Sequence, residues 1–226
     1  MDDKHHIVVA VDVTSEPVDK QQFHKISLQA KEGMGVDTII AIADKGYYSA
    51  SEFAKCKEDN IIPIVSKADH SNTAATLEYG KSRFIYDSKN DAYICPQGHL
   101  LHAYQPRKKN PKLVGHVRYF NSADCEKCQV KNKCTTSAKG RTIQDRPFQR
   151  IADEVDKRTA TNIALYKKRQ RLAEHPFGTL KRDFGFSYFL TRGTESVRAE
   201  SCMHFLIYNM KRVINIMGTE RLIKLI

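Results

Sequence analysis

Residues 38–65 read TIIAIADKGYYSASEFAKCKEDNIIPIV, and this stretch decides the fold class. Two apolar runs, 38–44 and 61–65, flank a segment in which a Ser-x-x-Glu capping pattern predicts a helix from about Ala50. Because a crossover helix returns the chain in the same direction, the two runs are predicted to be parallel strands of an α/β layer. Pro63 favours an edge position for the second strand, since proline cannot donate to a ladder.

The residues before this stretch extend the same pattern. HIVVAVDVT at 6–14 is β-branched and apolar, which predicts another strand buried on both faces. Apolar residues then recur at helical spacing over 20–34, and the GMG at 33–35 is expected to end that helix. Strand, helix, strand, helix and strand therefore occupy the first 65 residues.

The residues after it lose this rhythm and then regain a helical pattern. We interpret 66–145 as an insertion that contains four cysteines, polar turns and the basic run RKKNPK at 107–112. Helical patterning resumes after Pro147 and is expected to break at Pro176, just after Glu174. A final helix is predicted from about Thr194, with an apolar face made of Cys202, Leu206, Met210, Val213 and Met217.

Composition limits the class of protein and its partners. With 226 residues and 41% apolar content, the chain can bury one substantial core and at most a small second domain. The formal charge of +11 favours a polyanionic partner, nucleic acid first, over a basic surface that binds nothing. No apolar run is long enough to span a membrane and no signal-peptide core follows the start, so we expect a cytosolic protein without a membrane partner.

Four of the six cysteines are clustered in the insertion. Cys95 precedes His99 by four residues, and about thirty residues later Cys125, Cys128 and Cys134 follow as Cys-x2-Cys-x5-Cys. In a reducing compartment such clustering indicates metal or redox chemistry, and four thiolates from two turns suit a closed, structural zinc site. The alternative is that the cysteines are small core residues, and His99 competes with one thiol as a ligand. Cys56 and Cys202 lie in apolar helix patterns and are left out of this site.

Asp44 ends the strand at 38–44, where α/β sheets place their ligands. Taken alone, this position is better explained by an aspartate that only caps a turn. The surrounding ADKGYYS, however, closely resembles the segment around the second catalytic aspartate of insertion-sequence transposases with an RNase H-like DDE domain. ALYKKRQRLAEHPFGTLKRDFG, at 164–185, resembles the glutamate helix of the same enzymes, and the two motifs occur in the family's order.

The second motif carries four residues of the family constellation. Tyr166, Arg169, Glu174 and Lys181 follow the spacing Tyr-x2-Arg-x4-Glu-x6-Lys, and Arg171 is a second candidate for part of the arginine role. The resemblance implies that Asp44 and Glu174 are catalytic carboxylates that bind Mg2+ or Mn2+. It further implies that the tyrosine, arginine and lysine contact DNA at the element ends and target.

The resemblance also implies a domain plan. Residues 1–65 and 146–226 would form an RNase H-like catalytic domain, a mixed sheet flanked by helices and truncated at its first strands. Residues 66–145 would form a small zinc-ribbon-like insertion. Such enzymes cleave donor DNA and transfer the 3′ end to target DNA in the cytoplasm at the nucleoid, and pairing of two DNA ends is compatible with a homodimer of the intact enzyme.

The third carboxylate of a DDE site has no good candidate in this sequence. The resemblance places it on a strand before residue 6, and Asp2 and Asp3 fall in a hairpin turn. Asp12 lies within the strand at 6–14, where the family has no catalytic residue. We therefore expect a carboxyl-terminal transposase fragment that is inactive alone. A non-catalytic zinc-ribbon DNA-binding protein and a nuclease of the same fold are the alternatives.

Overall fold

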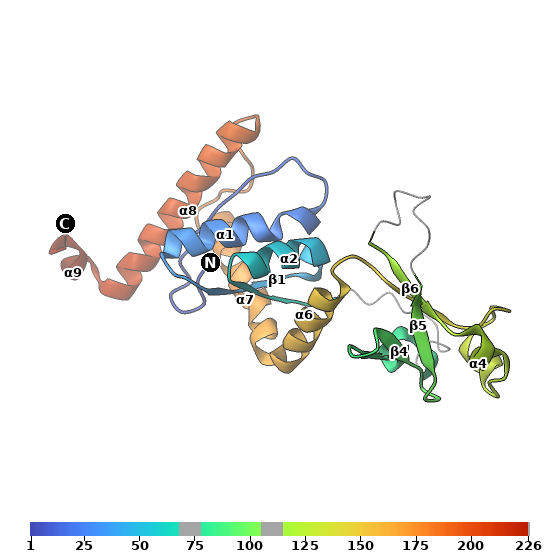
Figure 1. The fold of residues 1–226 in the computed structure, drawn as a ribbon. Coiled ribbons are helices and arrows are strands. Elements are labelled where there is room, and N and C mark those ends of the chain that lie inside the picture. The colour runs from blue at the N-terminus through green and yellow to red at the C-terminus, as the bar shows by residue number, and fades with distance from the viewer. Residues whose placement is uncertain (68–77, 105–114, 226) are drawn as a thin grey trace. The chain divides into compact units, whose positions relative to one another are not determined.

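A computed structural model describes residues 1–67, 78–104 and 115–225, so the basic run at 107–112 lies outside the described residues. The chain divides into two compact units, Met1–Ala68 with Arg150–Ile226, and Asp69–Gln149. Each contains helices and strands, so the molecule is a mixed α/β protein (Figure 1). No helix in the described part of the chain is both long enough and apolar enough to cross a membrane.

The first unit is built on two parallel strands. β1 (Ile39–Ala43) pairs with β2 (Ile61–Val65) in a register that places Ala41 opposite Pro63. α2 (Ala50–Glu58) connects them, and Figure 1 shows it beside α1 (Phe23–Met34). The predicted strand, crossover helix and parallel strand are confirmed. The core of this unit consists of Phe23, Phe53, Cys56, Ile61, Val65 and Val155.

The Ser-x-x-Glu sequence at the start of α2 does not form the predicted capping box. The Ser49 side chain makes no capping hydrogen bond. Glu52 is instead only 2% exposed and accepts the backbone N–H of His24 at 3.1 Å, in the first turn of α1. A carboxylate at a helix N-terminus satisfies an orphan donor and complements the helix dipole. Lys55 neutralises the same carboxylate at 2.8 Å, which explains why a buried glutamate is tolerated.

The segment 6–14 is not a strand, contrary to the sequence prediction. Its backbone groups bond to side chains of α8 (Thr194–Met217) instead of to a neighbouring strand. The Asn209 side chain bonds both the N–H and the carbonyl oxygen of Val8, each at 2.8 Å. Arg212 donates to the carbonyl oxygen of His5 at 2.8 Å. Side chains about 200 residues away thus replace the ladder that the β-branched sequence favours locally.

The outer edge of β2 is covered by α6 (Gln149–Thr161). The Thr159 hydroxyl accepts the N–H of Val65 and lies 3.2 Å from the carbonyl oxygen of the same residue. Arg158 donates to the carbonyl oxygen of Pro63 at 3.2 Å. Side chains of one helix therefore occupy the backbone groups that an edge strand would otherwise expose.

Pro176 does not end the helix that contains Glu174, and this expectation was wrong. α7 spans Ile163–Gly178 with Pro176 buried inside it, and a π-helical turn follows at Thr179–Asp183. A proline in a helix removes one N–H donor, and a wider turn is one way in which the backbone continues past such a break. Lys181 therefore remains on the same helical run as Glu174.

α8 begins at Thr194 as predicted, but three of the five residues of its predicted apolar face are exposed. Cys202 is exposed, as are Leu206 at 58% and Met210 at 56%, whereas the buried residues of the helix are Ser201 and Tyr208. Periodicity located the helix correctly and assigned the wrong face, because an apolar stripe can also be left uncovered. A short helix, α9 (Thr219–Ile223), follows.

The second unit is a five-stranded antiparallel meander in the order β3-β4-β5-β6-β7. Its short strands and the small helices α4 and α5 were not anticipated in the sequence of 66–145. Its core is rich in aromatic residues and consists of Phe84, Tyr93, Leu101, Tyr119 and Ile143. The elements are β3 (Ile85–Asp87), β4 (Ala92–Ile94), β5 (Leu100–Tyr104), β6 (Val117–Phe120), β7 (Thr142–Asp145), α4 (Ser122–Glu126) and α5 (Lys131–Cys134).

Candidate functional site

Asp44 stands at the carboxyl end of β1 and caps the 3-10 turn Lys45–Tyr47. Its side chain accepts the N–H of Lys45 through Oδ1. The carboxylate is nevertheless 52% exposed, because the tight turn lifts it from the sheet edge. The capping role and an accessible carboxylate thus coexist at one residue.

Helix α7 brings Arg169 to this carboxylate. Nη1 of Arg169 lies 3.3 Å from Oδ1 of Asp44, while the guanidinium stands over the Tyr166 ring at 5.2 Å from its centroid. Nε of Arg169 is buried and has no hydrogen-bond partner in the described part of the structure. Three of the predicted site residues, from segments far apart in sequence, therefore meet. Arg171 is exposed, so the contact with Asp44 is made by Arg169.

Glu174 and Lys181 lie further along the same helical run. Glu174 is exposed and accepts the Gln170 side-chain N–H at 3.1 Å. On a regular helix it stands about 140° around the axis from Arg169, so it projects in a different direction from the contact with Asp44. Lys181 is exposed in the π-helical turn, which rotates it relative to Glu174 compared with an unbroken α-helix.

Each carboxylate has an oxygen that could bind a hard divalent cation, but the two do not form a closed site in the described part of the structure. Oδ2 of Asp44 and Oε2 of Glu174 accept no hydrogen bond from any described residue, which leaves each able to donate to a metal. Carboxylate oxygens are the ligands that Mg2+ prefers. However, no group of three or more His, Cys, Asp or Glu side chains within the described residues is arranged to hold a metal.

Asp19 is a carboxylate near this site that the sequence analysis missed. Its Oδ2 lies 3.9 Å from the position that a Cβ on Gly46 would occupy, beside the turn that Asp44 caps. Burial raises the pKa of Tyr47 in this turn, and the negative charges of Asp19 and Asp44 raise it further. No sequence signal indicates this proximity, because Asp19 belongs to a short 3-10 turn, Asp19–Gln21.

The other aspartates considered for a third carboxylate have structural partners. Asp12 is 13% exposed and pairs with Lys25 at 2.6 Å and with Arg198 at 3.2 Å. The hydrogen bond from Lys25 lowers the pKa of Asp12. Asp2 accepts backbone N–H groups within its own turn, including that of His5 at 2.7 Å. Both residues are thus engaged in holding the amino-terminal segment.

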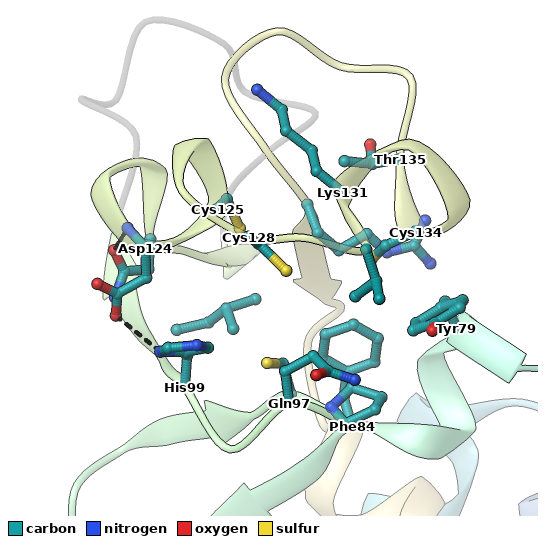
Figure 2. Close-up of a pocket in the computed structure, with 16 residues that line it drawn as sticks. Tyr79, Phe84, Gln97, His99, Asp124, Cys125, Cys128, Lys131, Cys134 and Thr135 are labelled. Atoms are coloured by element: carbon teal, nitrogen blue, oxygen red, sulfur yellow. Dashed lines mark hydrogen bonds and ion pairs between the residues drawn. The ribbon is translucent and has the colours of Figure 1, made fainter.

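The four clustered cysteines of the second unit line one small pocket of about 30 Å3. Figure 2 shows Cys125, Cys128 and Cys134 on the side formed by α4 and α5, with Gln97 and Phe84 facing them. All four thiols are free and partly buried. The volume is enough for a water-sized occupant and therefore for a single metal ion.

The electrostatics of this pocket favour a cation. Burial raises the pKa of the Cys134 thiol, and the neighbouring thiols Cys125, Cys95 and Cys128 raise it further while Arg141 lowers it. Four thiolates in one neighbourhood repel one another, and a divalent metal removes that cost. The thiols are compatible with zinc in number and type, although they are not gathered into a ligand set here.

Two neighbours shape the pocket. Nδ1 of His99 lies 3.3 Å from Oδ2 of Asp124, so His99 is engaged by a carboxylate at the rim (Figure 2). Gly140 has φ +91°, and a Cβ there would come within 2.5 Å of the Cys125 Cβ. Only glycine fits this close approach.

Cys56 lies elsewhere, in the core of the first unit, where burial raises its pKa to about 12.

The site thus combines an exposed carboxylate at the end of β1 with a basic side chain on α7, and a guanidinium of this kind is compatible with phosphate binding. The family profile "Transposase DDE domain" matches residues 94–214, more than half of the chain. The chain therefore belongs to the DDE transposase family. The match includes the four clustered cysteines, Tyr166, Arg169, Glu174 and Lys181 but not Asp44. No curated protein and no solved structure matches the chain.

Proposed function

We propose that this chain is the carboxyl-terminal catalytic part of a DNA transposase, with Asp44 and Glu174 as two of its metal-binding carboxylates. The observation that carries the proposal is the 3.3 Å contact between Arg169 and Asp44, which joins the two family motifs in space. The parallel β1–β2 pair with its flanking helices is compatible with part of an RNase H-like domain in the first unit.

The chemistry follows from the residues that surround Asp44. Divalent cations held by Asp44 and Glu174 would activate the attacking oxygen and stabilise the leaving oxygen of a phosphodiester. Arg169 would hold Asp44 until DNA binds and then contact a flanking phosphate, since a guanidinium forms paired hydrogen bonds with phosphate oxygens. Tyr166 positions the guanidinium by stacking, and Lys181 provides a second cation for the strand.

We propose that the chain does not transpose DNA by itself. Two carboxylates are fewer than the reaction needs, and Asp12, the nearest substitute in sequence, is bound by Lys25 and Arg198. Metal-dependent strand cleavage by the purified chain that is lost on Asp12→Asn would overturn this part. Strand-transfer products from a complemented enzyme would distinguish a transposase from a nuclease of the same fold.

We propose a structural zinc ion in the insertion, held by Cys95, Cys125, Cys128 and Cys134. The shared pocket and the four free thiols support it, and the pairing of His99 with Asp124 favours thiols over imidazole. With zinc the insertion would be ribbon-like and stabilised by the metal. Elemental analysis of purified protein should give one zinc per chain, and its absence would refute this proposal.

One measurement distinguishes a metal-binding transposase from a non-catalytic zinc-ribbon DNA-binding protein. Titration with Mn2+, followed by the loss of the free-ion electron paramagnetic resonance signal, should show binding that Asp44→Asn and Glu174→Gln each weaken at least tenfold. Zinc content should stay unchanged in both variants, because the cysteines lie in the other unit. A non-catalytic DNA-binding protein predicts no difference between these variants and the parent chain.

We propose that the intact enzyme is a homodimer, located in the cytoplasm at the nucleoid, and that α8 contributes to its interface. Met203, Leu206, Ile207, Met210 and Ile214 form an exposed stripe on this helix, between 37% and 64% exposed. Together they leave roughly 300 Å2 of apolar side chain in water, the size of the largest apolar patch on many monomers, which is often functional. The stripe carries no charge, which favours a second copy over DNA as its occupant.

Sedimentation equilibrium tests this surface. Met210→Glu should shift the chain toward monomer, since a charge would be buried in the interface. Ile216→Glu is the matched control, because Ile216 is 48% exposed but stands about 120° around the helix from Met210. A monomeric parent chain, or equal effects of the two variants, would refute an α8 interface.

A further inference from the structure

The sheet of the second unit has a solvent-facing side of unusual composition. Side chains alternate along strands, and Leu101, Tyr119 and Ile143 point into the core. On the opposite side of the sheet, six neighbouring residues of the adjacent strands β5, β6 and β7 are all exposed. These residues, called here the open face, are His102, Tyr104, Arg118, Phe120, Thr142 and Gln144.

Two aromatic rings lie on the open face. Tyr104 is 49% exposed and Phe120 is 37% exposed, and their ring centroids are 5.7 Å apart in an edge-to-face arrangement. The strand register holds them, because Phe120 pairs with His102 and Arg118 pairs with Tyr104. Exposed aromatic rings on a rigid sheet lose little conformational entropy when a flat ligand stacks on them.

The charge of the open face fits a polyanion. Arg118 is exposed beside Tyr104, and its guanidinium makes no ion pair or hydrogen bond with any described residue. No carboxylate projects from this side of β5, β6 or β7, since Asp145 points inward and is only 4% exposed. A cation next to stacking rings, on a chain with a net charge of +11, favours phosphate-linked bases over an acidic or apolar protein partner.

We propose that the open face binds single-stranded DNA, with bases stacked on Tyr104 and Phe120 and a phosphate on Arg118. The rings favour unpaired bases because paired bases keep their flat surfaces inside the duplex. The choice of DNA over RNA rests on the proposed function, in which the chain cleaves DNA strands. The open face belongs to the second unit, whereas Asp44 and Glu174 belong to the first. The insertion would therefore bind the strand with residues other than those of the proposed metal site.

Fluorescence anisotropy of labelled dT12 against the full chain tests the proposal, with a 12-base-pair duplex and rU12 as comparisons. Tyr104→Ala and Phe120→Ala should each weaken dT12 binding roughly fivefold or more, the loss of one stacked base, and leave duplex binding unchanged. Tyr104→Phe should bind like the parent chain, because it keeps the ring. Ile85→Ala, which removes a side chain that is 67% exposed on β3, should have no effect.

The outcomes separate this inference from the proposed function. Unchanged dT12 binding in both alanine variants overturns the open-face site while duplex binding still supports a DNA-handling enzyme. Equal losses for dT12 and duplex, with unchanged circular dichroism, overturn the preference for unpaired bases. Tighter binding of rU12 than of dT12 overturns the choice of DNA. Failure of the parent chain to bind any of the three refutes the proposed function as well.

Discussion

Replacing Gly140 with alanine should damage the cysteine pocket more than replacing Gly98 or Gly115 of the same unit. The added methyl would stand 2.5 Å from the Cβ and 2.9 Å from the Sγ of Cys125. Relieving this overlap costs about 1–3 kcal/mol, the usual penalty of overpacking. The φ of +91° adds roughly 1–2 kcal/mol for any residue with a side chain. We therefore expect a total loss of about 2–5 kcal/mol in the free energy of unfolding.

Gly98 offers a matched control beside another cysteine of the pocket. It has φ +83°, but a Cβ there meets nothing within 4 Å. Gly98→Ala should therefore cost only the backbone penalty of about 1–2 kcal/mol. The difference between the two variants isolates the contact with Cys125, and at about 2–4 °C per kcal/mol for a chain of this length it is large enough for a thermal melt.

The assay combines thermal melting followed by circular dichroism with competition for zinc against a chromophoric chelator. Gly140→Ala should melt at a lower temperature than Gly98→Ala and lose zinc at lower chelator concentration, because its Cys125 thiolate is displaced. Equal melting temperatures and equal zinc retention in the two variants would refute the argument. That result would mean that Cys125 can move without cost, so the pocket would not be a built site.

Three further predictions concern charged groups. Arg169→Ala should change the free energy of unfolding by less than about 1 kcal/mol, since its partner Asp44 is half exposed. The same variant should lower the slope of log affinity for duplex DNA against log salt concentration by about one. An unchanged slope would exclude Arg169 from the DNA contact. Asp12→Asn should destabilise the fold by about 1–3 kcal/mol and leave Mn2+ binding intact. Because the hydrogen bond from Lys25 lowers the pKa of Asp12, this contribution is present above the ordinary aspartate pKa and is lost on acidification below about pH 4, so urea unfolding of the variant should depend less on pH there. Burial raises the pKa of Cys134, so metal-free protein should lose stability as pH rises above about 9. Zinc affinity should increase from about pH 6 to pH 8, because the metal displaces thiol protons. A melting temperature of the metal-free protein that does not fall above about pH 9 would contradict the burial of the Cys134 thiol.

Local sequence signals predicted the elements whose partners are close in the chain. The strand expected at 38–44 is β1, Ile39–Ala43, and the helix expected near Ala50 is α2. Both depend on periodicity and on a short crossover, which neighbouring residues determine. The start of α8 at Thr194 was equally accessible, because Gly193 has a positive φ and the helix begins directly after it.

Features that depend on distant partners were not accessible in this way. The apolar run 6–14 reads as a strand, yet side chains of Asn209 and Arg198 bond to its backbone at Val8 and Val13. Glu52 has the spacing of a capping box, yet it serves a different helix. The short strands of the insertion were missed because their core uses tyrosines paired across the sheet, which give no strong apolar alternation in runs of three to five residues.

The sequence likewise predicted only those parts of the candidate site that do not depend on distant packing. The resemblance named Asp44 and Arg169, and the structure brings them into contact. It also named Lys181, whose direction depends on the helix continuing through Pro176, which the sequence argued against. Asp19 carried no signal at all, because only the packing of two short 3-10 turns brings it close to Asp44.

Iron-mediated backbone cleavage is the most direct test of the central claim that Asp44 and Glu174 share a metal site. Fe2+ replaces Mg2+ in zinc-loaded protein, and ascorbate with peroxide generates radicals that cut the chain beside the bound ion. The account predicts cuts near residue 44 and near residue 174, both suppressed by excess Mg2+ and both lost in Asp44→Asn. Cuts confined to other positions, or cuts near 174 that persist in Asp44→Asn, would show that the two carboxylates do not hold a common metal.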